Sequence, residues 1–275
     1  MLQLDDNSML CASYAWALVP ASHAQKLKDA ARLGDFVFMG GTMYRSDDGG
    51  AHWSEIALPP TQGEKNLGPF GQPLPAYNRG AMCQGKDGRV FWVTAMENVG
   101  GKKGTGTHLL ISSDRGKTWN YSCPVAVDEK VTFNETSIYE TPKGDLIAFM
   151  RTANFDDNTV IARSTDGGKS FAKWESAGWK GHPHYALRLP DERVLLVYGY
   201  RHAPFGIRAR VLNAECSDFK DAPEIVLRAD GGHGDLGYPW ATMVADDKAL
   251  VVYYFNESDG PRYIGGTLLQ VNTKK

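Results

Sequence analysis

Glu135 and Arg151 stand at two strand ends where a simple core would carry valine or leucine. Glu135 opens one predicted strand and Arg151 closes the next, after a turn at Lys143-Gly144. Two strands joined by a tight turn run antiparallel, so these two residues return to the same end of one hairpin. A carboxylate and a guanidinium are costly to leave unpaired beside apolar strands. The pattern predicts either a salt bridge that caps the hairpin or part of a site that binds an ionic group.

Tyr238 opens another apolar strand, within GYPWATMVADDKALVVYYF. A tyrosine is a suitable nucleophile toward a substrate that carries a carboxylate, because a neutral phenol can approach where an aspartate or glutamate would be repelled. The ordinary tyrosine pKa of about 10 requires a neighbouring carboxylate to take the proton and arginines to favour the phenolate. The other interpretation of Tyr238 is an aromatic side chain that packs on Pro239.

A turn motif, Ser-x-Asp-x-Gly-x-x-aromatic, occurs three times in the chain. The glycine fits a tight turn with positive φ, and the Ser and Asp side chains can bond the amides of that same turn. The aromatic residue anchors the turn to a core. The three copies are Ser46-Asp48-Gly50-Trp53, Ser112-Asp114-Gly116-Trp119 and Ser164-Asp166-Gly168-Phe171. We interpret the motif as a structural element of hairpins, without a chemical role.

Each motif belongs to a larger unit of apolar strands joined by charged turns, and five such units are recognisable. The first three that carry the motif are expected to continue from it into a fourth strand. Repeated units of about 45–60 residues with four strands are typical of a β-propeller. A sandwich would not repeat one turn at one place in each unit, and a solenoid has shorter periods. We therefore predict a single all-β domain over residues 1–275, a β-propeller whose first blade is incomplete at its N-terminus. Residues 21–33 are the one helical stretch, and the segment 58–77 is a linker between blades.

Residues at the starts of the inner strands of a propeller converge on one mouth of its central channel. In this chain polar residues stand at the starts of the predicted inner strands. Two arginines stand at the ends of the second strands of their units, and a third arginine lies on the third strand of one unit. They are Asn78, Arg79, Asn134, Glu135, His182, His184, Asp235 and Tyr238 at the starts, Arg151 and Arg201 at the ends, and Arg208 on the third strand. This convergence is the strongest functional signal in the sequence.

The repeated motif in a propeller resembles the sialidase (neuraminidase) superfamily of BNR, or Asp-box, repeat proteins, over essentially the whole chain. That family usually has six blades. The runs NETSIYETPKGDLIAFMR and GYPWATMVADDKALVVYYF resemble two of its active-site segments. The resemblance implies that Tyr238 is the nucleophile, that Glu135 activates it and that Arg151 is one of three arginines gripping a substrate carboxylate. It also implies an acid/base aspartate, for which the spacing before Ser46 favours Asp35, with Asp29 as a competitor.

The arginine set departs from the family. The first family arginine opens the first inner strand, and this chain begins past that position. Arg79, at the mouth end of the neighbouring blade, is the obvious substitute. Either Arg201 or Arg208 would be the third arginine. Two arginines would still hold a uronate-like carboxylate by bidentate contacts.

His182, His184 and His233 have no simple counterpart in the family. A metal site lacks a clear third ligand. Contacts to sugar hydroxyls and plain core or loop positions are the two other interpretations. His184 could also transfer protons, because imidazole titrates near neutrality.

The composition excludes some partners. The net charge is −2, without a Lys/Arg run, so no nucleic acid is expected. No run approaches the ~18 apolar residues of a membrane span. The four cysteines have no metal or redox spacing and are interpreted as buried thiols or disulfides. We expect no metal and no cofactor. No export signal opens the chain, although the resemblance implies proteins that are often secreted or periplasmic.

These observations predict an exo-acting, retaining glycoside hydrolase, similar to the sialidases, that removes a terminal acidic sugar from a glycan. Two alternatives stay open. A polysaccharide lyase would abstract the C5 proton of a uronate with Tyr238 and His182 or His184. A propeller that binds carbohydrate without catalysis would need none of these roles.

Overall fold

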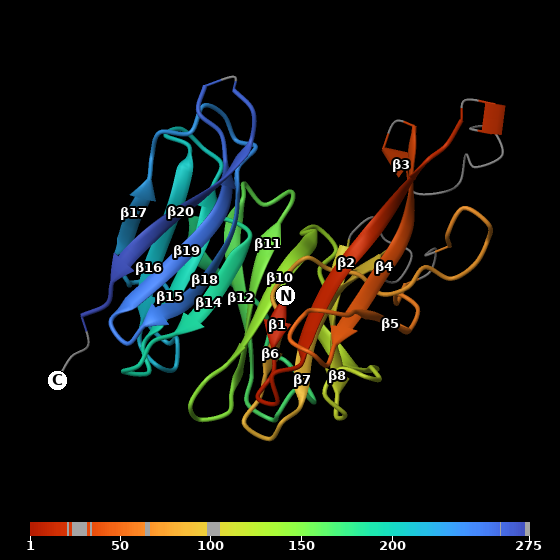
Figure 1. The fold of residues 1–275 in the computed structure, drawn as a ribbon, viewed down its shortest axis with the longest axis horizontal. Coiled ribbons are helices and arrows are strands. Elements are labelled where there is room, and N and C mark those ends of the chain that lie inside the picture. The colour runs from red at the N-terminus through yellow and green to blue at the C-terminus, as the bar shows by residue number, and fades with distance from the viewer. Residues whose placement is uncertain are drawn as a thin grey trace. The chain divides into compact units, whose positions relative to one another are not determined.

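The strands of this protein form antiparallel sheets that follow one another along the chain. The computed structural model describes residues 1–20, 22–23, 32–33, 35–63, 67–97, 105–258 and 260–272. These residues form five sheets, and no α-helix occurs among them. Figure 1 labels the strands, coloured from the N-terminus to the C-terminus.

The first two sheets contain the strands up to residue 126. The first sheet contains β1 (Leu2–Gln3), β2 (Met9–Leu18), β3 (Arg32–Leu33), β4 (Phe36–Ser46) and β5 (Ser54–Ile56). The second contains β6 (Cys83–Gln84), β7 (Val90–Glu97), β8 (Thr105–Ser112) and β9 (Asn120–Ala126). In the first sheet the order is β1-β2-β4-β3, with β5 also paired to β4.

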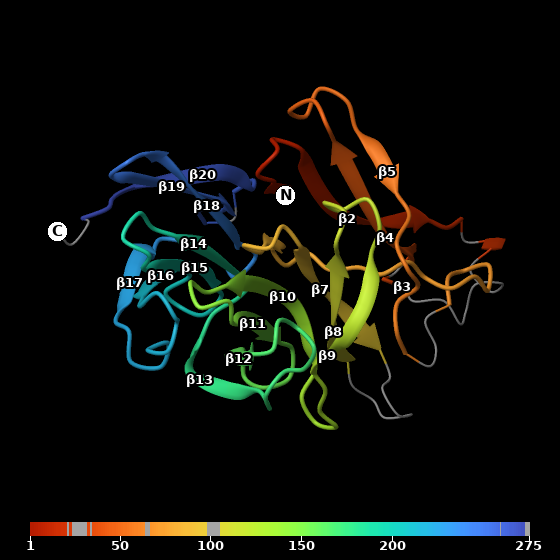
Figure 2. The same cartoon turned by 90° about the horizontal axis from the view of Figure 1, so that it is seen from below.

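The other three sheets are meanders in which each strand pairs with the next. The third contains β10 (Phe133–Glu140), β11 (Leu146–Thr152), β12 (Asn158–Ser164) and β13 (Glu175–Lys180). The fourth contains β14 (His184–Arg188), β15 (Val194–Tyr200), β16 (Gly206–Leu212) and β17 (Glu224–Arg228). The fifth contains β18 (Gly237–Ala245), β19 (Lys248–Phe255) and β20 (Tyr263–Gln270). Figure 2 shows β10 to β13 and β14 to β17 each in this order.

The chain divides into two units, Met1–Asn134 and Glu135–Lys275. The core of the first unit includes Leu10, Met43 and Trp92. The second unit has one cluster around Phe149 and Tyr198 and another that contains Val251 and Phe255. Strands β11 and β15 are continuous apolar runs that are buried along nearly all their length, as is typical of strands covered on both faces, and they carry Phe149 and Tyr198.

The three turn motifs have the hydrogen bonds that their residue types predict. In each, the serine hydroxyl donates to the aspartate Oδ1 at 2.8 Å, and the glycine amide donates to the serine Oγ at 2.7 to 2.9 Å. The amide four residues after each aspartate donates to the same Oδ1 at 2.8 to 3.0 Å. The indoles of Trp53 and Trp119 donate to the glycine carbonyls of their turns. The motif therefore satisfies its own backbone, as its composition predicts.

One detail of the predicted organisation is wrong, and one turn differs from the repeated motif. The fourth sheet has a fourth strand, β17, although no copy of the motif precedes it. Asn213 replaces the motif there, because its Oδ1 accepts the amides of Glu215 and Ser217 at 3.1 and 3.0 Å. The helix predicted over residues 21–33 falls mostly outside the described residues. Arg32 and Leu33 pair with Val37 and Phe36 in β3, so the prediction is wrong for those two.

Candidate active site

A β-bulge at the start of β18 sets the direction of Tyr238. Gly237 pairs with Tyr254 and Trp240 with Val252, so β18 has one residue more than β19 between these pairs. Tyr238 has φ +46°, an unusual conformation for a bulky residue, and Gly237 has φ +120°. Bulges re-aim side chains and are common beside active sites. The backbone here is held in a strained form that gives the phenol its direction.

The carboxylate of Glu135 lies between Tyr238 and Arg151. The hydroxyl of Tyr238 donates a hydrogen bond to Oε1 of Glu135, and Nη1 of Arg151 donates to Oε2 at 2.6 Å. Glu135 lies near the start of β10 and Arg151 near the end of β11, as the hairpin argument predicts, and Glu135 is only 7% exposed. The buried carboxylate of Glu135 therefore accepts a hydrogen bond from a phenol at one oxygen and from a guanidinium at the other.

Arg151 is a firmly charged group with a further donor available. Burial opposes its charged form, but the carboxylate of Glu135 outweighs this effect and the pKa of Arg151 is raised. Its Nε is buried and has no hydrogen-bond partner among the described residues. Buried donors of this kind are rare in folded proteins and mark places where water or a ligand binds.

Arg201 follows β15 and lies beside the ring of Tyr238. Its guanidinium carbon is 5.6 Å from the centroid of that ring. Its Nε donates to the carbonyl of Leu236 at 3.0 Å and its Nη2 donates to the hydroxyl of Tyr254 at 3.0 Å. The structure thus brings Tyr238, Glu135, Arg151 and Arg201 together within the second unit.

Asp235 and Tyr254 form the outer part of this group. The Tyr254 hydroxyl donates to Oδ1 of Asp235 at 2.8 Å, and Arg262 donates to Oδ2 through Nε at 2.9 Å. The hydrogen bond from Tyr254 is the main cause of a lowered pKa of Asp235, with smaller contributions from Arg262 and Arg201. Asp235 is therefore a charged residue that is already engaged by protein donors.

The carboxylate of Asp157 lies near two histidines, although neither of the facing ring nitrogens makes a hydrogen bond among the described residues. Its Oδ1 lies 3.4 Å from Nε2 of His182, and its Oδ2 lies 3.1 Å from Nε2 of His202. Burial, followed by the nearby charges of Arg151 and Arg201, lowers the pKa of His182 to about 3. His182 is thus neutral at ordinary pH. Asp157 and His202 were not predicted from the sequence; the available signal was that Asp157 directly precedes β12 and His202 closely follows β15.

His184 and Arg208 are buried side chains whose contacts are with other groups of the protein interior. His184 is 4% exposed, packs near Phe149, Trp179 and Tyr198, and has Nε2 2.9 Å from Oγ1 of Thr159. Burial lowers its pKa to about 3.

The guanidinium of Arg208 is 3% exposed. It donates to the carbonyls of Pro204 and Arg228 and lies 3.6 Å from the carboxylate of Glu224. These contacts hold Arg208 within the fourth sheet, and Arg201 is the arginine that lies beside Tyr238.

Asp35 and Arg79 belong to the first unit, and their roles in the site stay predictions. Asp35 precedes β4, and its carbonyl accepts the amide of Val19 at 2.8 Å. The guanidinium of Arg79 lies 4.7 Å from the ring centroid of Tyr14. Asp29, the competitor of Asp35, lies outside the described residues.

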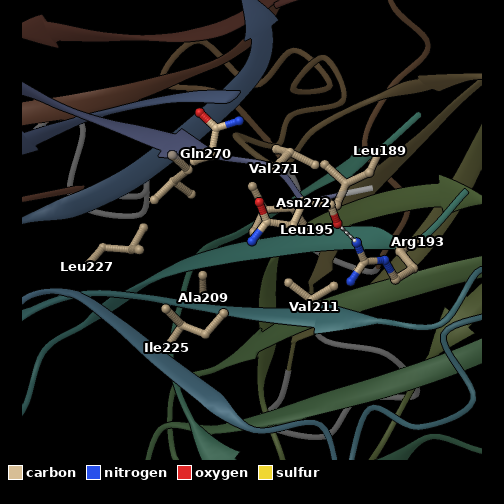
Figure 3. A pocket seen from close by; sticks show the side chains of 11 residues that line it. Leu189, Arg193, Leu195, Ala209, Val211, Ile225, Leu227, Gln270, Val271 and Asn272 are labelled. Atoms are coloured by element: carbon tan, nitrogen blue, oxygen red, sulfur yellow. Dashed lines mark hydrogen bonds between the residues drawn. The ribbon is translucent and has the colours of Figure 1, made fainter. Parts of the chain in front are cut away.

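Three further features of the described residues concern metal ligands, membrane-spanning helices and one cavity. Within them, no three His, Cys, Asp or Glu side chains are grouped so as to hold a metal ion. No helix of this part of the chain has the length and apolar character to cross a membrane. A cavity of about 290 Å³ lies between the fourth and fifth sheets (Figure 3). Its lining is mainly apolar, including Leu195, Val211 and Ile225, and contains none of the predicted site residues.

Comparison with known proteins decides the family. The sequence matches a model described as a BNR repeat-like domain over residues 29–251, most of the chain. The chain belongs to the BNR repeat-like family. The predicted membership of the BNR, or Asp-box, repeat proteins is thereby confirmed. A search of curated proteins found no match.

Solved structures show which fold this BNR repeat-like protein has. A protein of unknown function from Dyadobacter fermentans is 56% identical, with a TM-score of 0.95, over 98% of this chain and 75% of that one. An α-L-arabinanase from Penicillium chrysogenum, complexed with arabinobiose, is 16% identical, with a TM-score of 0.64, over 95% and 78%. The NanB sialidase from Streptococcus pneumoniae is 19% identical, with a TM-score of 0.58, over 92% and 39%. The fold is that of a β-propeller, with five antiparallel sheets among the described residues, and the predicted fold class is confirmed.

Proposed function

We propose that this BNR repeat-like protein is a retaining exo-glycosidase that removes a terminal acidic sugar, sialic acid or a related one. Tyr238 is its nucleophile and Glu135 is the base that activates it. The observation that carries the proposal is the hydrogen bond from the Tyr238 hydroxyl to the buried Glu135 carboxylate. A phenol needs such a partner to lose its proton during attack.

The reaction has two displacements. In the first, the oxygen of Tyr238 bonds to the anomeric carbon, the Tyr238 proton passes to Glu135, and the glycosidic bond breaks. The departing oxygen takes a proton from the acid/base residue, for which Asp35 is the predicted candidate. In the second, water gives that residue a proton and bonds to the anomeric carbon, while Tyr238 leaves and recovers its proton from Glu135. Two displacements retain the anomeric configuration, and a tyrosine nucleophile is an established exception among glycosidases.

The charges around Tyr238 favour an acidic sugar. Arg151 holds Glu135 on one side and has its pKa raised, and Arg201 lies beside the phenol ring. Guanidinium groups bind carboxylates through paired hydrogen bonds, and they also favour a phenolate over a phenol. A substrate carboxylate would lie near two cations and near a nucleophile that carries no charge before the reaction.

The lyase alternative receives no support from the two histidines. His184 is buried among aromatic rings and faces Thr159. His182 has a pKa of about 3, which makes it a weak base near neutral pH. Neither residue has the properties of a base that removes the C5 proton of a uronate.

The test compares the wild type with Tyr238→Phe on fluorogenic glycosides of sialic acid, glucuronic acid and arabinofuranose, and on a uronate polymer. We expect hydrolysis of an acidic glycoside with retained configuration by NMR, and a loss of roughly 10³-fold or more in Tyr238→Phe. Tyr263→Phe is the control, because Tyr263 bonds Glu257 in an exposed pair on another strand. Activity on the arabinofuranoside alone, an unsaturated product from the polymer, or full activity in Tyr238→Phe would each reject the proposal.

A further inference from the structure

Arg201 is fixed in place by two neighbours. Nε donates to the main-chain carbonyl of Leu236 and Nη2 donates to the phenol oxygen of Tyr254, each at 3.0 Å. Among the described residues Nη1 has no hydrogen-bond partner in the protein. Because a guanidinium is planar, fixing two of its nitrogens also fixes the direction of the third. The structure therefore holds one donor edge of Arg201 in a defined orientation beside Tyr238.

Tyr254 can accept this bond because its own proton is used elsewhere. Its hydroxyl donates to Oδ1 of Asp235 at 2.8 Å, which leaves a lone pair for Nη2 of Arg201. The Asp235 carboxylate is held in turn by Arg262, whose Nε and Nη2 lie 2.9 and 2.8 Å from Oδ2. A charged carboxylate at the end of such a chain strengthens each bond in it.

The strand pairing explains why these residues meet. Tyr254 lies on β19 opposite Gly237 of β18, directly beside the bulge that carries Tyr238. The rings of Tyr238 and Tyr254 are 6.0 Å apart, centroid to centroid. Any change in the orientation of Tyr254 therefore affects both the nucleophile and the arginine next to it.

We propose that Tyr254 and Asp235 are positioning residues that orient Arg201 to bind the carboxylate of an acidic sugar. The inference rests on the acidic substrate class of the proposed function. Asp235, one of the polar residues predicted at the starts of the inner strands, acts here through Tyr254. The pair Tyr254–Asp235 thus determines the preference of the site for an acid over a neutral sugar.

A matched set of side chains in the same unit provides a control. Nη2 of Arg228 lies 3.5 Å from the hydroxyl of Tyr263, which donates to Oε1 of Glu257 at 2.5 Å. This set also joins an arginine, a tyrosine and a carboxylate, and Arg228 stacks on Phe255 with 4.2 Å between guanidinium carbon and ring centroid. Tyr263→Phe removes the same kind of hydroxyl without touching Arg201.

The experiment measures binding of N-acetylneuraminate and of its methyl ester, by calorimetry or ligand-observed NMR, to the wild type, Tyr254→Phe, Asp235→Asn and Tyr263→Phe. The two ligands differ in the carboxylate charge. We expect the wild type to prefer the acid, and Tyr254→Phe to reduce the acid-to-ester affinity ratio by about 10-fold or more, the usual effect of losing a hydrogen bond to a charged group. Asp235→Asn should reduce the ratio in the same direction, and Tyr263→Phe should leave it unchanged.

Three results would overturn the inference. They are an equal loss of affinity for both ligands in Tyr254→Phe, an unchanged acid-to-ester affinity ratio in that variant, and a wild type that does not prefer the acid. Equal losses would mean that Tyr254 has a structural role only. Hydrolysis is measured separately. A preference for the acid that depends on Tyr254, without hydrolysis of any glycoside, would leave the inference standing and reject the proposed function.

Discussion

The hydroxyl of Tyr238 donates a hydrogen bond to Glu135, which lies 103 residues earlier in the chain. The two residues come from different sheets, β18 and β10, within one unit of the protein. Nη1 of Arg151 donates a hydrogen bond to the other carboxylate oxygen of Glu135 at 2.6 Å, so this carboxylate links a phenol and a guanidinium. The proposed nucleophile, its base and the cation that holds the base are therefore three different side chains, and each can be substituted separately.

Glu135→Gln should reduce kcat by about 10² to 10⁴-fold on an acidic aryl glycoside, because the amide keeps the shape of the side chain but cannot take the phenol proton. KM should change much less, since Arg201 keeps its contacts with Leu236 and Tyr254. Steady-state kinetics of the folded variant check this. Glu175→Gln, which changes an exposed pair with Lys220, is the matched control. Wild-type kcat in Glu135→Gln would contradict the assigned role.

Gly199→Ala should destabilise the protein by roughly 1–3 kcal/mol and also lower activity. A Cβ at residue 199 would lie 2.8 Å from the carbonyl oxygen of His182 and 3.0 Å from Cα of Gly237. Both are backbone atoms, so relief requires movement of the strand start that carries Tyr238. Urea denaturation and kinetics on the same preparation measure the two effects.

Gly266→Ala is the control for this substitution. Its added Cβ would meet nothing closer than 3.5 Å, which is ordinary contact. We expect it to leave activity unchanged and to alter stability only slightly. If the two glycine variants behaved alike, the close approach of Gly199 to Gly237 would have no functional importance.

Ser112→Ala should destabilise the first unit by about 1–3 kcal/mol and leave the kinetic constants of the folded enzyme unchanged. The Ser112 hydroxyl is buried, accepts the amide of Gly116 at 2.7 Å and donates to Asp114 at 2.8 Å. Its removal leaves a buried amide without its acceptor. Thermal and urea unfolding give the stability, and the rate per folded molecule gives the activity. A fall in kcat with normal stability would show that the motif has a chemical role after all.

Stability of the second unit should fall as the pH drops below about 6.5. The pKa values of His182 and His184 are about 3 in the folded protein, against about 6.5 in an unfolded chain. The unfolded chain therefore binds more protons below pH 6.5, and the stabilisation present above that pH is lost as the pH falls toward 3. Each histidine contributes up to about 1.4 kcal/mol per pH unit in this window.

Urea denaturation between pH 5.5 and 7.5 measures this slope, to which half-buried His108 of the first unit also contributes, and His184→Gln removes one of the two sources in the second unit. The variant should show a shallower pH dependence, whatever its absolute stability. An unchanged slope would mean that His184 does not have a lowered pKa in the folded protein.

Local residue patterns were enough to predict the blades and several of the residues that lie together in the candidate site. The turn motif, the charged hairpin turns and the alternation of apolar residues are short-range features, and each involves residues within one hairpin. The position of Glu135 and Arg151 at one end of a hairpin follows from antiparallel pairing alone. Tyr238 was predicted from its place at a strand start and from resemblance to a family segment. The turn at Asn213 carries no copy of the motif, because a different residue makes the same kind of turn.

The choice between Arg201 and Arg208, and the participation of Tyr254, Asp157 and His202, required the tertiary structure. Arg208 lies inside β16 opposite Tyr198, whereas Arg201 lies just past the end of β15. A shift of one residue reverses the face on which a side chain lies, so sequence spacing alone could not distinguish the two. Tyr254 reaches Arg201 only because a bulge in β18 and the pairing of β19 bring them together. The sequence by itself determined the repeating hairpins, because their hydrogen bonds join near neighbours; the long-range pairing of sheets decided which polar side chains meet.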